Sequence, residues 1–479
     1  MRGMHDTLIE TPSLRVLLET DGNSRQTQLI QEAIDSVAAR GGGTVVLAAG
    51  LYTTGTVHLR SGVTLHLAKG AVLKASPDIA EYHRKARTTH GASAAEQRSV
   101  LFQENRPQAT AHIFAENATD IALTGEGTID GNGTAFYKAE GRKGQVDWIE
   151  AKKLTGTWVP SLESSGIGPE RPFCVVQFIN CRGVRFENLR IQNPPRWTVH
   201  TIACEDLLFR RVTVYSPVHA PNGDGIDLDA CSNVLIEDCD IATSDDSICL
   251  KNTNMWGLKR PSRNITVRRC RLRSTTHAFT IGTESMDDFE NISVTDIQIS
   301  GHEGHPCITA IGLSVFQGGA LRGVHISGVT VTDSVLPLYI RLGTECLGVT
   351  GYPPGLIEDI LLENITVRGA TGNSFMTGLP GHPLRNVTLR NVSIEFTHRI
   401  EPAEVMREVP EMPEEYANNL VWRHLPCYGL FCRHVSGLEL ADLLIVNMLN
   451  DARPALLLKD VESFTGSNVL LPDPSQPQP

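Results

Sequence analysis

A short apolar pattern recurs eleven times along the chain and restricts the fold more than any other feature. Each copy has a polar or glycine turn, an apolar-x-apolar stretch, a few further residues and a second apolar-x-apolar stretch. The first apolar residues of the copies are Val63, Ile121, Val184, Leu207, Val234, Ile265, Ile292, Val324, Ile360, Val387 and Leu438. Between residues 184 and 387 neighbouring copies lie 23 to 36 residues apart. Such a period is typical of solenoid coils, which bury their apolar sides only by stacking.

The repeat predicts an all-β fold, a single-stranded right-handed parallel β-helix. Blades of a β-propeller need about 40–50 residues, and the leucine pattern of leucine-rich repeats is absent. Apolar residues at helical spacing between Ser24 and Gly41 predict one amphipathic helix, at about residues 24–40, that caps the solenoid. We expect one domain over residues 1–479, with a disordered tail at residues 473–479.

Three long stretches interrupt the repeat: Asp78 to Gln108, Asn132 to Glu170 and Thr397 to Pro426. Long excursions from a rigid scaffold often carry binding function, so we expect these stretches to form walls beside a groove. The alternative for each is a surface loop without function. The third stretch holds an acidic run, for which a solvated face is the other interpretation.

Charge and composition restrict the classes of molecule that the protein can bind. A formal net charge of −11 disfavours nucleic acid or an anionic membrane, and no run is long and apolar enough to span a membrane. Residues 1–24 show no signal peptide, which predicts a cytoplasmic protein, with secretion as the alternative. The eleven cysteines fall largely on apolar repeat positions, which favours buried packing over disulfides. No spacing indicates a metal or cofactor, and none indicates an oligomeric state.

Acidic residues gather in one stretch, residues 222–252. Asp224 and Asp245 lie 21 residues apart, which is one coil, so both should face one groove on adjacent coils, with Asp246 beside them. Carboxylates held close together divide their roles, one staying protonated as an acid while another stays ionised as a base. Glycoside hydrolysis needs that division. We interpret Asp227 as a buried, hydrogen-bonded residue that holds the turn.

The chain resembles family 28 of the glycoside hydrolases, the polygalacturonase group of the pectin-lyase-like β-helix proteins. The matching motifs are GGGTVVLAAGLYTTGTVHL, GTIDGNG, NPPRWTVH, NGDGIDLD and TSDDSICLKN. The resemblance implies an inverting hydrolase of pectin-derived oligosaccharides, of the galacturonan or rhamnogalacturonan type. Asp245 would protonate the glycosidic oxygen, while Asp224 and Asp246 orient and deprotonate the attacking water. Gly223 and Ser244 depart from the family's Asn-Thr-Asp-Gly and Gly-Asp-Asp patterns.

The resemblance also suggests substrate contacts. His277 aligns with the histidine of a Gly-His-Gly motif and could hold the proton of a neighbouring carboxylate; the alternative is a packed structural histidine. Lys251 matches a lysine of the family and could bind a uronate carboxylate, with a solvated surface lysine as the alternative. Asn222 is a further candidate for substrate binding, although its position suits fixing the loop.

The largest departure lies where polygalacturonases have Arg-Ile-Lys, since the chain reads IGLSVFQGG from Ile311. Neither Ser314 nor Gln317 replaces a charge-assisted contact with a carboxylate. We therefore expect either that Arg341, one coil later, supplies a substitute charge or that the sugar at this position is neutral, with rhamnose as the candidate. Walls around the groove imply exo action. A polysaccharide lyase and a non-catalytic glycan-binding β-helix are the alternatives to a hydrolase.

Overall fold

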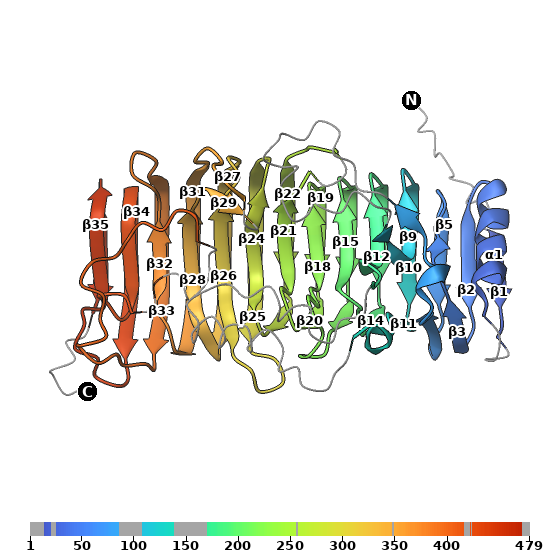
Figure 1. Ribbon diagram of the computed structural model, residues 1–479, viewed down its shortest axis with the longest axis horizontal. Helices are drawn as coiled ribbons and strands as arrows, with labels where there is room; N and C mark the ends of the chain where they lie inside the picture. Colours follow the sequence, from blue (N-terminus) through green and yellow to red (C-terminus); the bar gives the residue numbers. More distant parts are fainter. Residues whose placement is uncertain are drawn as a thin grey trace, which may run out of the picture.

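A computed structural model describes residues 14–20, 25–85, 108–137, 170–254, 257–346, 349–415, 422 and 424–471. The chain winds into successive coils whose strands pair in parallel with those of the next coil (Figure 1). Parallel pairing from coil to coil produces three long faces along one axis. The predicted parallel β-helix is therefore confirmed.

The first face carries the site described below. Its strands are β4 (Val57–His58), β9 (Ala111–Glu116), β12 (Cys174–Ile179), β15 (Trp197–Ile202), β18 (Ile226–Asp229), β21 (Ile248–Asn252), β24 (His277–Ser285), β26 (Cys307–Val315), β28 (Ser334–Leu342), β32 (Ser374–Thr377), the start of β34 (Leu430–Asn447) and β35 (Leu456–Glu462). Successive side chains on these strands alternate between the core and the outer surface. The outward residues of neighbouring coils thus form straight columns.

The other two faces share several long strands. The second face holds β1 (Leu14–Leu18), β2 (Gly43–Leu47), β5 (Val63–Leu67), β10 (Thr119–Gly125), β13 (Arg182–Glu187), β16 (Glu205–Arg210), β19 (Ser232–Glu237) and β22 (Ser262–Arg268). The third face holds β3 (Gly50–Thr54), β6 (Ala71–Ala75), β11 (Thr128–Asp130), β14 (Arg190–Gln192), β17 (Thr213–Tyr215), β20 (Asp240–Thr243) and β23 (Arg271–Ser274). Both faces then continue in β25 (Phe289–Ser300), β27 (Ala320–Thr332), β31 (Leu356–Ala370), β33 (Leu384–Phe396), β34 and β36 (Thr465–Leu470).

A few short elements leave the coils. They are the hairpin of β7 (Arg84–Lys85) with β8 (Gln108–Ala109), the hairpin of β29 (Glu345–Cys346) with β30 (Val349–Thr350), and the 3₁₀ helices η1 (Ile79–Glu81) and η2 (Gly133–Ala135). Much of the first two predicted insertions, and the predicted disordered tail at residues 473–479, lie outside the described residues.

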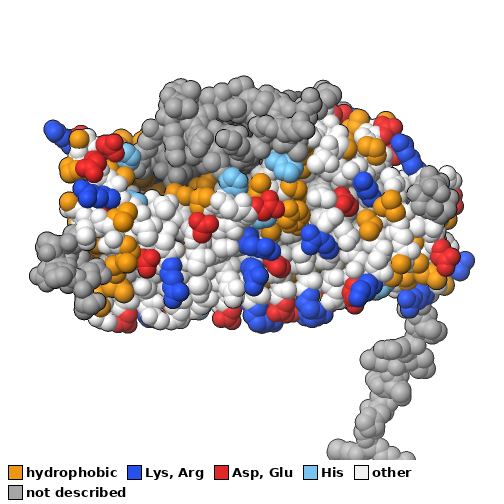
Figure 2. All heavy atoms as spheres, turned by 90° about the horizontal axis from the view of Figure 1, so that it is seen from below, with side chains coloured by type: hydrophobic (Ala, Val, Ile, Leu, Met, Phe, Trp, Pro, Cys, Tyr) orange, Lys and Arg blue, Asp and Glu red, His pale blue; other side chains and the backbone are white. Residues whose placement is uncertain are grey.

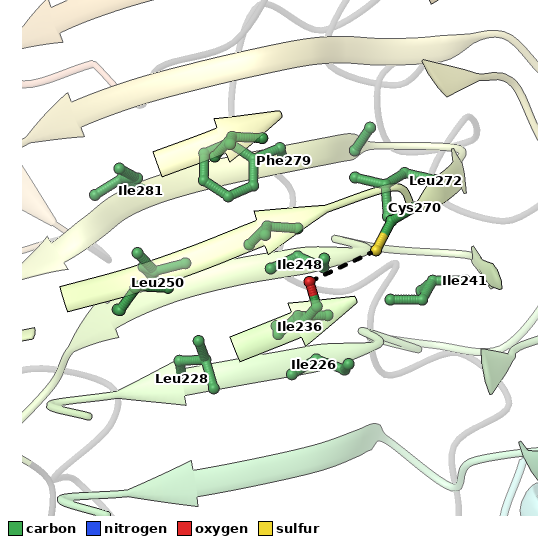
Figure 3. Close-up of a cluster of buried hydrophobic side chains, with 14 of the residues drawn as sticks. Ile226, Leu228, Ile236, Ile241, Ile248, Leu250, Cys270, Leu272, Phe279 and Ile281 are labelled. Carbon is green, nitrogen blue, oxygen red and sulfur yellow. Dashed lines mark hydrogen bonds between the residues drawn. The ribbon is translucent and has the colours of Figure 1, made fainter. Parts of the chain in front are cut away.

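The repeat residues form the core. From Ile121 to Leu438, each predicted first apolar residue pairs in register with that of the next coil, and all are buried. Figure 3 shows inward-pointing side chains of β18, β21 and β24 stacked on one another, among them Ile226, Ile248 and Phe279. The ten cysteines whose side chains the structure describes are buried and unpaired, which confirms the packing interpretation for them.

The helix α1 (Thr27–Ala39) lies across the first coils at one end of the solenoid (Figure 1). Its apolar side chains Ile30, Ile34 and Val37 are buried against the core, as predicted. The helix begins after Gln26, whose side chain makes no capping hydrogen bond. Burial of one apolar stripe therefore holds the helix in place.

On the outside, charges of both signs are interspersed (Figure 2). Arg268 and Arg269, for example, both contact Glu237 on the second face, at 2.7 and 2.8 Å.

In the part of the chain that the structure describes, no helix has the length and apolar character needed to cross a membrane.

Candidate active site

The predicted catalytic carboxylates lie just before two neighbouring strands of the first face. Asp224 precedes β18, and Asp245 and Asp246 precede β21. The backbone N–H of Gly225 donates to the carbonyl oxygen of Asp246 at 2.8 Å, so the two turns stack directly. The structure thus places the three aspartates on adjacent coils, as the repeat predicts.

The three side chains converge. One carboxylate oxygen from each of Asp224, Asp245 and Asp246 lies within 4.8 Å of the others. Asp224 and Asp246 are buried, with 4% and 6% of their surface exposed, and Asp245 is half-buried. The hydroxyl of Thr276 donates toward Oδ1 of Asp245 at 3.0 Å and toward Oδ1 of Asp246 at 3.3 Å. Carboxylates this close cannot all be ionised at once without strong repulsion.

The surroundings separate the proton affinities of the three carboxylates. Burial raises the pKa of Asp245 well above its usual range, and the charges of Asp224 and Asp246 raise it further. Burial and the charge of Asp227 raise the pKa of Asp224 in the same way. Burial would also raise the pKa of Asp246, but the charge of His277 and its hydrogen bond hold that pKa below its usual range. The cluster therefore combines an ionised carboxylate with protonated neighbours.

His277 begins β24, one coil after the paired aspartates. Its Nδ1 lies 2.8 Å from Oδ1 of Asp246, so the predicted hydrogen bond to a carboxylate is present. Burial lowers the pKa of His277, but the charge of Asp246 and this hydrogen bond outweigh burial and raise it. The other ring nitrogen, Nε2, is buried and has no hydrogen-bond partner among the described residues. It remains available to a bound sugar or water.

The two departures from the family pattern compensate each other. A Cβ atom on Gly223 would lie 2.0 Å from the hydroxyl of Ser216 and 2.3 Å from that of Ser244. Those two hydroxyls lie 3.1 Å apart, and the hydroxyl of Ser244 also donates to the carbonyl oxygen of Ala220 at 2.7 Å. The side chain of Ser244 therefore fills the space that Gly223 leaves.

Lys251 is a buried cation beside the cluster. Its Nζ lies 3.7 Å from Oδ1 of Asp227, 3.7 Å from Oε2 of Glu284 and 5.0 Å from the ring centroid of Trp197. Its side chain is only 7% exposed, so the alternative of a solvated surface lysine is wrong. Burial would lower its pKa, but the neighbouring Cys249, Glu284 and Asp227 hold the pKa well above the usual range. Lys251 therefore keeps its charge.

Asp227 differs from the prediction. Ile226 and Leu228 point into the core (Figure 3), so Asp227 between them points outward, toward the site. It is fully buried, yet neither of its carboxylate oxygens has a hydrogen-bond partner among the described residues. Its charged neighbour is Lys251. Asp227 thus belongs to the charge network of the site and does not hold the turn.

Three contact residues were not found from the sequence: Glu284 and Trp197 beside Lys251, and Arg171. Arg171 donates to Oδ1 of Asn222 at 2.9 Å and to the carbonyl oxygen of Pro221 at 2.8 Å. Asn222 therefore fixes the loop before Asp224, and sugar binding by its amide stays a prediction. Only Trp197 had a signal, because it lies within the matching motif NPPRWTVH.

Arg341 is not where the prediction puts it. Only 1% of its surface is exposed, its guanidinium lies 4.6 Å from the ring centroid of Trp422, and it donates to the carbonyl oxygen of Met412. Met412 and Trp422, both from the described part of the stretch between Thr397 and Pro426, cover the guanidinium. The prediction that Arg341 offers a substitute charge at the groove surface is therefore wrong.

The position of the missing Arg-Ile-Lys is filled without a cation. The ring of Tyr339 covers Gly312, since a Cβ atom there would lie 2.6 Å from the ring. The hydroxyl of Ser314 donates to the carbonyl oxygen of Ile281 at 3.0 Å. The amide of Gln317 accepts from the backbone of Ser285 and donates to the hydroxyl of Tyr352. The polar side chains at this position thus form hydrogen bonds with other groups of the protein.

The arrangement supports proton transfer. The same three carboxylates are close enough to hold a cation, and Nδ1 of His277 lies 2.8 Å from Oδ1 of Asp246. A protonated Asp245 beside an ionised Asp246 supplies an acid and a base within one site. That pair is the minimum that acid–base cleavage of a glycosidic bond requires.

The chain is similar to several known proteins. The model of glycosyl hydrolases family 28 matches residues 88–411. The chain is 26% identical over 389 residues to a probable polygalacturonase of Vitis vinifera, covering 78% of this chain and 72% of that protein. It is 23% identical over 398 residues to an exo-poly-alpha-D-galacturonosidase of Dickeya chrysanthemi, covering 77% of this chain and 63% of that protein.

A solved structure shows the same fold. The hyperthermoactive exopolygalacturonase from Thermotoga maritima matches with a TM-score of 0.65 at 21% identity, covering 91% of this chain and 92% of that one. The family match includes both acidic clusters and His277, and it extends over more than half of the chain. The protein is thus a glycosidase and belongs to family 28 of the glycosyl hydrolases.

Proposed function

We propose that the protein hydrolyses pectic oligosaccharides from one end of the chain, with Asp245 as the acid and Asp224 with Asp246 as the base. One observation carries this proposal: a half-buried carboxyl with a raised pKa adjoins a carboxylate whose pKa His277 lowers. The names of similar proteins, a probable polygalacturonase and an exo-poly-alpha-D-galacturonosidase, support the pectic substrate.

The reaction begins when the carboxyl of Asp245 donates its proton to the glycosidic oxygen. The bond from the anomeric carbon to that oxygen breaks, and the sugar ring gains oxocarbenium character. A water held by Asp224 and Asp246 attacks the anomeric carbon and gives up a proton to the ionised carboxylate of Asp246. Hydrogen bonds of about 2.8 Å to two oxygens let one water bridge up to about 5.6 Å, which covers the 4.8 Å within which the three oxygens lie.

Attack from the face opposite to the acid inverts the anomeric configuration. Inverting enzymes separate their acid and base carboxyl groups by about 6.5–9.5 Å and retaining enzymes by about 5–5.5 Å. The nearest oxygens of the present cluster approach more closely than either range. Inversion is supported here by the pair of carboxylates, Asp224 and Asp246, that can hold a water together.

A lyase is a weaker explanation of the site. A lyase needs a neutral Lys or another base beside the cleaved bond, but the carboxylates of Glu284 and Asp227 keep Lys251 charged. A glycan-binding protein without activity would gain nothing from three converging carboxylates, whose mutual repulsion destabilises the fold. Both features favour hydrolysis.

We further propose that the sugar next to the Tyr339 ring is neutral, with rhamnose as the candidate. The ring lies over Gly312, and the polar groups of Ser314 and Gln317 are used internally. A uronate there would lose its hydration without gaining a cation. On the other side of the bond, charged Lys251 can attract a uronate carboxylate.

Action inside the cell on short imported oligomers is a separate proposal. It rests on ten buried, unpaired cysteines in the described part of the chain, since reducing compartments keep thiols free. Cell fractionation tests it, and recovery of the protein from the medium would contradict it.

The function is tested by incubating the protein with polygalacturonate, rhamnogalacturonan and their short oligomers. Reducing ends and product sizes are followed from the first minutes. We expect reducing ends from the oligomers, with a monomer as the first small product. Intact substrates in every incubation would contradict hydrolysis, and a ladder of mid-sized products from polygalacturonate would contradict exo action.

A further inference from the structure

A second apolar core lies outside the coils, on the first face. Tyr339, Phe375 and Phe431 occupy successive register positions on β28, β32 and β34 and point outward. With Phe316 and Trp422 they form one buried cluster. We call these five aromatic residues, with Arg341 and Arg433, the C-terminal plug. Aromatic side chains therefore fill the outer face of these coils. The same face of the catalytic coils holds the polar active site instead.

Two buried arginines fasten the cover of the plug. Nη1 of Arg433 donates to the carbonyl oxygen of Val409 at 2.7 Å, and Nη2 donates to that of Pro410 at 3.1 Å. Arg341 donates to the carbonyl oxygen of Met412. Trp422 donates to Pro410 at 2.9 Å. Backbone from the predicted third insertion is thus tied across the first face.

Aromatic contacts complete the cover. The Trp422 ring lies 4.6 Å from the guanidinium of Arg341 and 5.3 Å from the ring of Phe375. The rings of Tyr339 and Phe375 are stacked, with centroids 5.6 Å apart. Trp422 is 4% exposed and Tyr339 is 1% exposed. The members of the plug are therefore packed against one another.

The plug starts directly beside the candidate active site. Tyr339 leans back over Gly312 toward the catalytic coils, and its ring centroid lies 6.3 Å from that of His277. Only one coil, a distance of about 4.8 Å, separates the His277 strand β24 from the strand β21 that follows Asp246. The free length of the groove on this side is therefore about that of a single sugar unit.

We infer that the C-terminal plug ends the groove beside His277 and that Tyr339 limits the substrate on that side to one sugar unit. This inference rests on the proposed hydrolysis of oligosaccharides and adds the residue that sets the product length. One of the two products of each cleavage then leaves as a monomer. Tyr339 acts here as a specificity-determining residue, while the carboxylates carry out the chemistry.

The test replaces Tyr339 and follows the first products. Wild type, Tyr339→Ala and Tyr339→Leu are incubated with oligogalacturonides and rhamnogalacturonan oligomers of defined length, and products are separated by chromatography with mass detection. Tyr339→Leu keeps apolar burial in case the alanine variant does not fold. We expect monomer from the wild type and at least a tenfold rise in the dimer-to-monomer ratio for the variants.

Phe431→Leu is the matched control. Phe431 belongs to the same core, but its strand β34 pairs one coil beyond β32 and two beyond β28, away from His277. It should lower thermal stability and leave monomer as the product. A folded, active Tyr339 variant with the wild-type product ratio would overturn the inference, as would a Phe431→Leu variant that also releases dimer. No cleavage by the wild type would instead overturn the proposed function itself.

Discussion

Nδ1 of His277 lies 2.8 Å from Oδ1 of Asp246, and this contact separates the proton affinities of two adjacent aspartates. It lowers the pKa of Asp246 below its usual range, while the neighbouring Asp245 carries a raised pKa. Two residues that are adjacent in sequence thus become an acid and a base because one has a histidine partner on the next coil.

Asp245→Asn should abolish most turnover, because the amide cannot donate a proton to the glycosidic oxygen. General acid catalysis contributes about 10²–10⁴-fold, so we expect kcat to fall by that factor. Asp240→Asn is the control, since Asp240 lies on the third face, is 42% exposed and pairs with Arg273. Activity of Asp245→Asn within tenfold of the wild type would contradict the assignment.

His277→Gln should move the pH profile of kcat/KM to higher pH on both sides. Without the imidazolium, the pKa of Asp246 rises. Asp246 then becomes protonated, and stops acting as the base, at a higher pH than in the wild type. The charge of His277 also lowers the pKa of Asp245, so its removal keeps the acid protonated to a higher pH. Initial rates over the pH range measure both limbs, and an unshifted acidic limb would exclude this role.

Lys251→Met should destabilise the fold, because Asp227 and Glu284 would keep their buried carboxylates without the neighbouring cation. Removing one partner of a buried ion pair lowers the free energy of unfolding by about 3–5 kcal/mol. Urea unfolding measures the change, with exposed Lys459→Met as a control that should stay within about 0.5 kcal/mol of the wild type. A loss below about 1 kcal/mol would show that Lys251 does not stabilise this network.

Rhamnogalacturonan oligomers should be cut faster than oligogalacturonides of equal length. Gly312, Ser314 and Gln317 offer no free cation past the cleaved bond, and the apolar ring of Tyr339 covers Gly312. Comparison of kcat/KM for the two substrate series tests this. Faster release of galacturonate from oligogalacturonides would contradict the neutral sugar and leave the exo action standing.

The first product should have the anomeric configuration opposite to that of the bond that was cut. Proton NMR spectra taken within minutes of mixing, before mutarotation, record the configuration directly. A retained configuration would mean that a carboxylate attacks the sugar. The nearest oxygens of the three carboxylates lie closer together than the acid and base groups of either class of enzyme, so this measurement is needed to distinguish inversion from retention.

The repeat was sufficient to predict the fold, because every coil must present the same apolar positions to its neighbours. Ile121, Val184 and Leu207 pair in register as the pattern requires. The acidic clusters were predictable for the same reason, since one coil separates Asp224 from Asp245. Periodicity thus determines what repeats from coil to coil.

The remaining contacts depend on residues that do not repeat. Arg341 is covered by a segment that folds back from about 70 residues further along the chain. Glu284 and Trp197 meet Lys251 from separate coils, and Tyr339 leans over Gly312 only because that position lacks a side chain. No periodic signal marks such tertiary contacts, so the sequence predicted the scaffold better than the ends of the groove.

Mass spectrometry of the products formed in heavy-oxygen water tests the central claim most directly. If Asp224 and Asp246 activate a water and Asp245 protonates the leaving oxygen, each cleavage must add one water molecule, and the heavy oxygen must appear at the new reducing end. Asp245→Asn should suppress that label. Products that lack the added water and absorb in the ultraviolet through a new double bond, or glycan bound without any cleavage, would contradict a hydrolase.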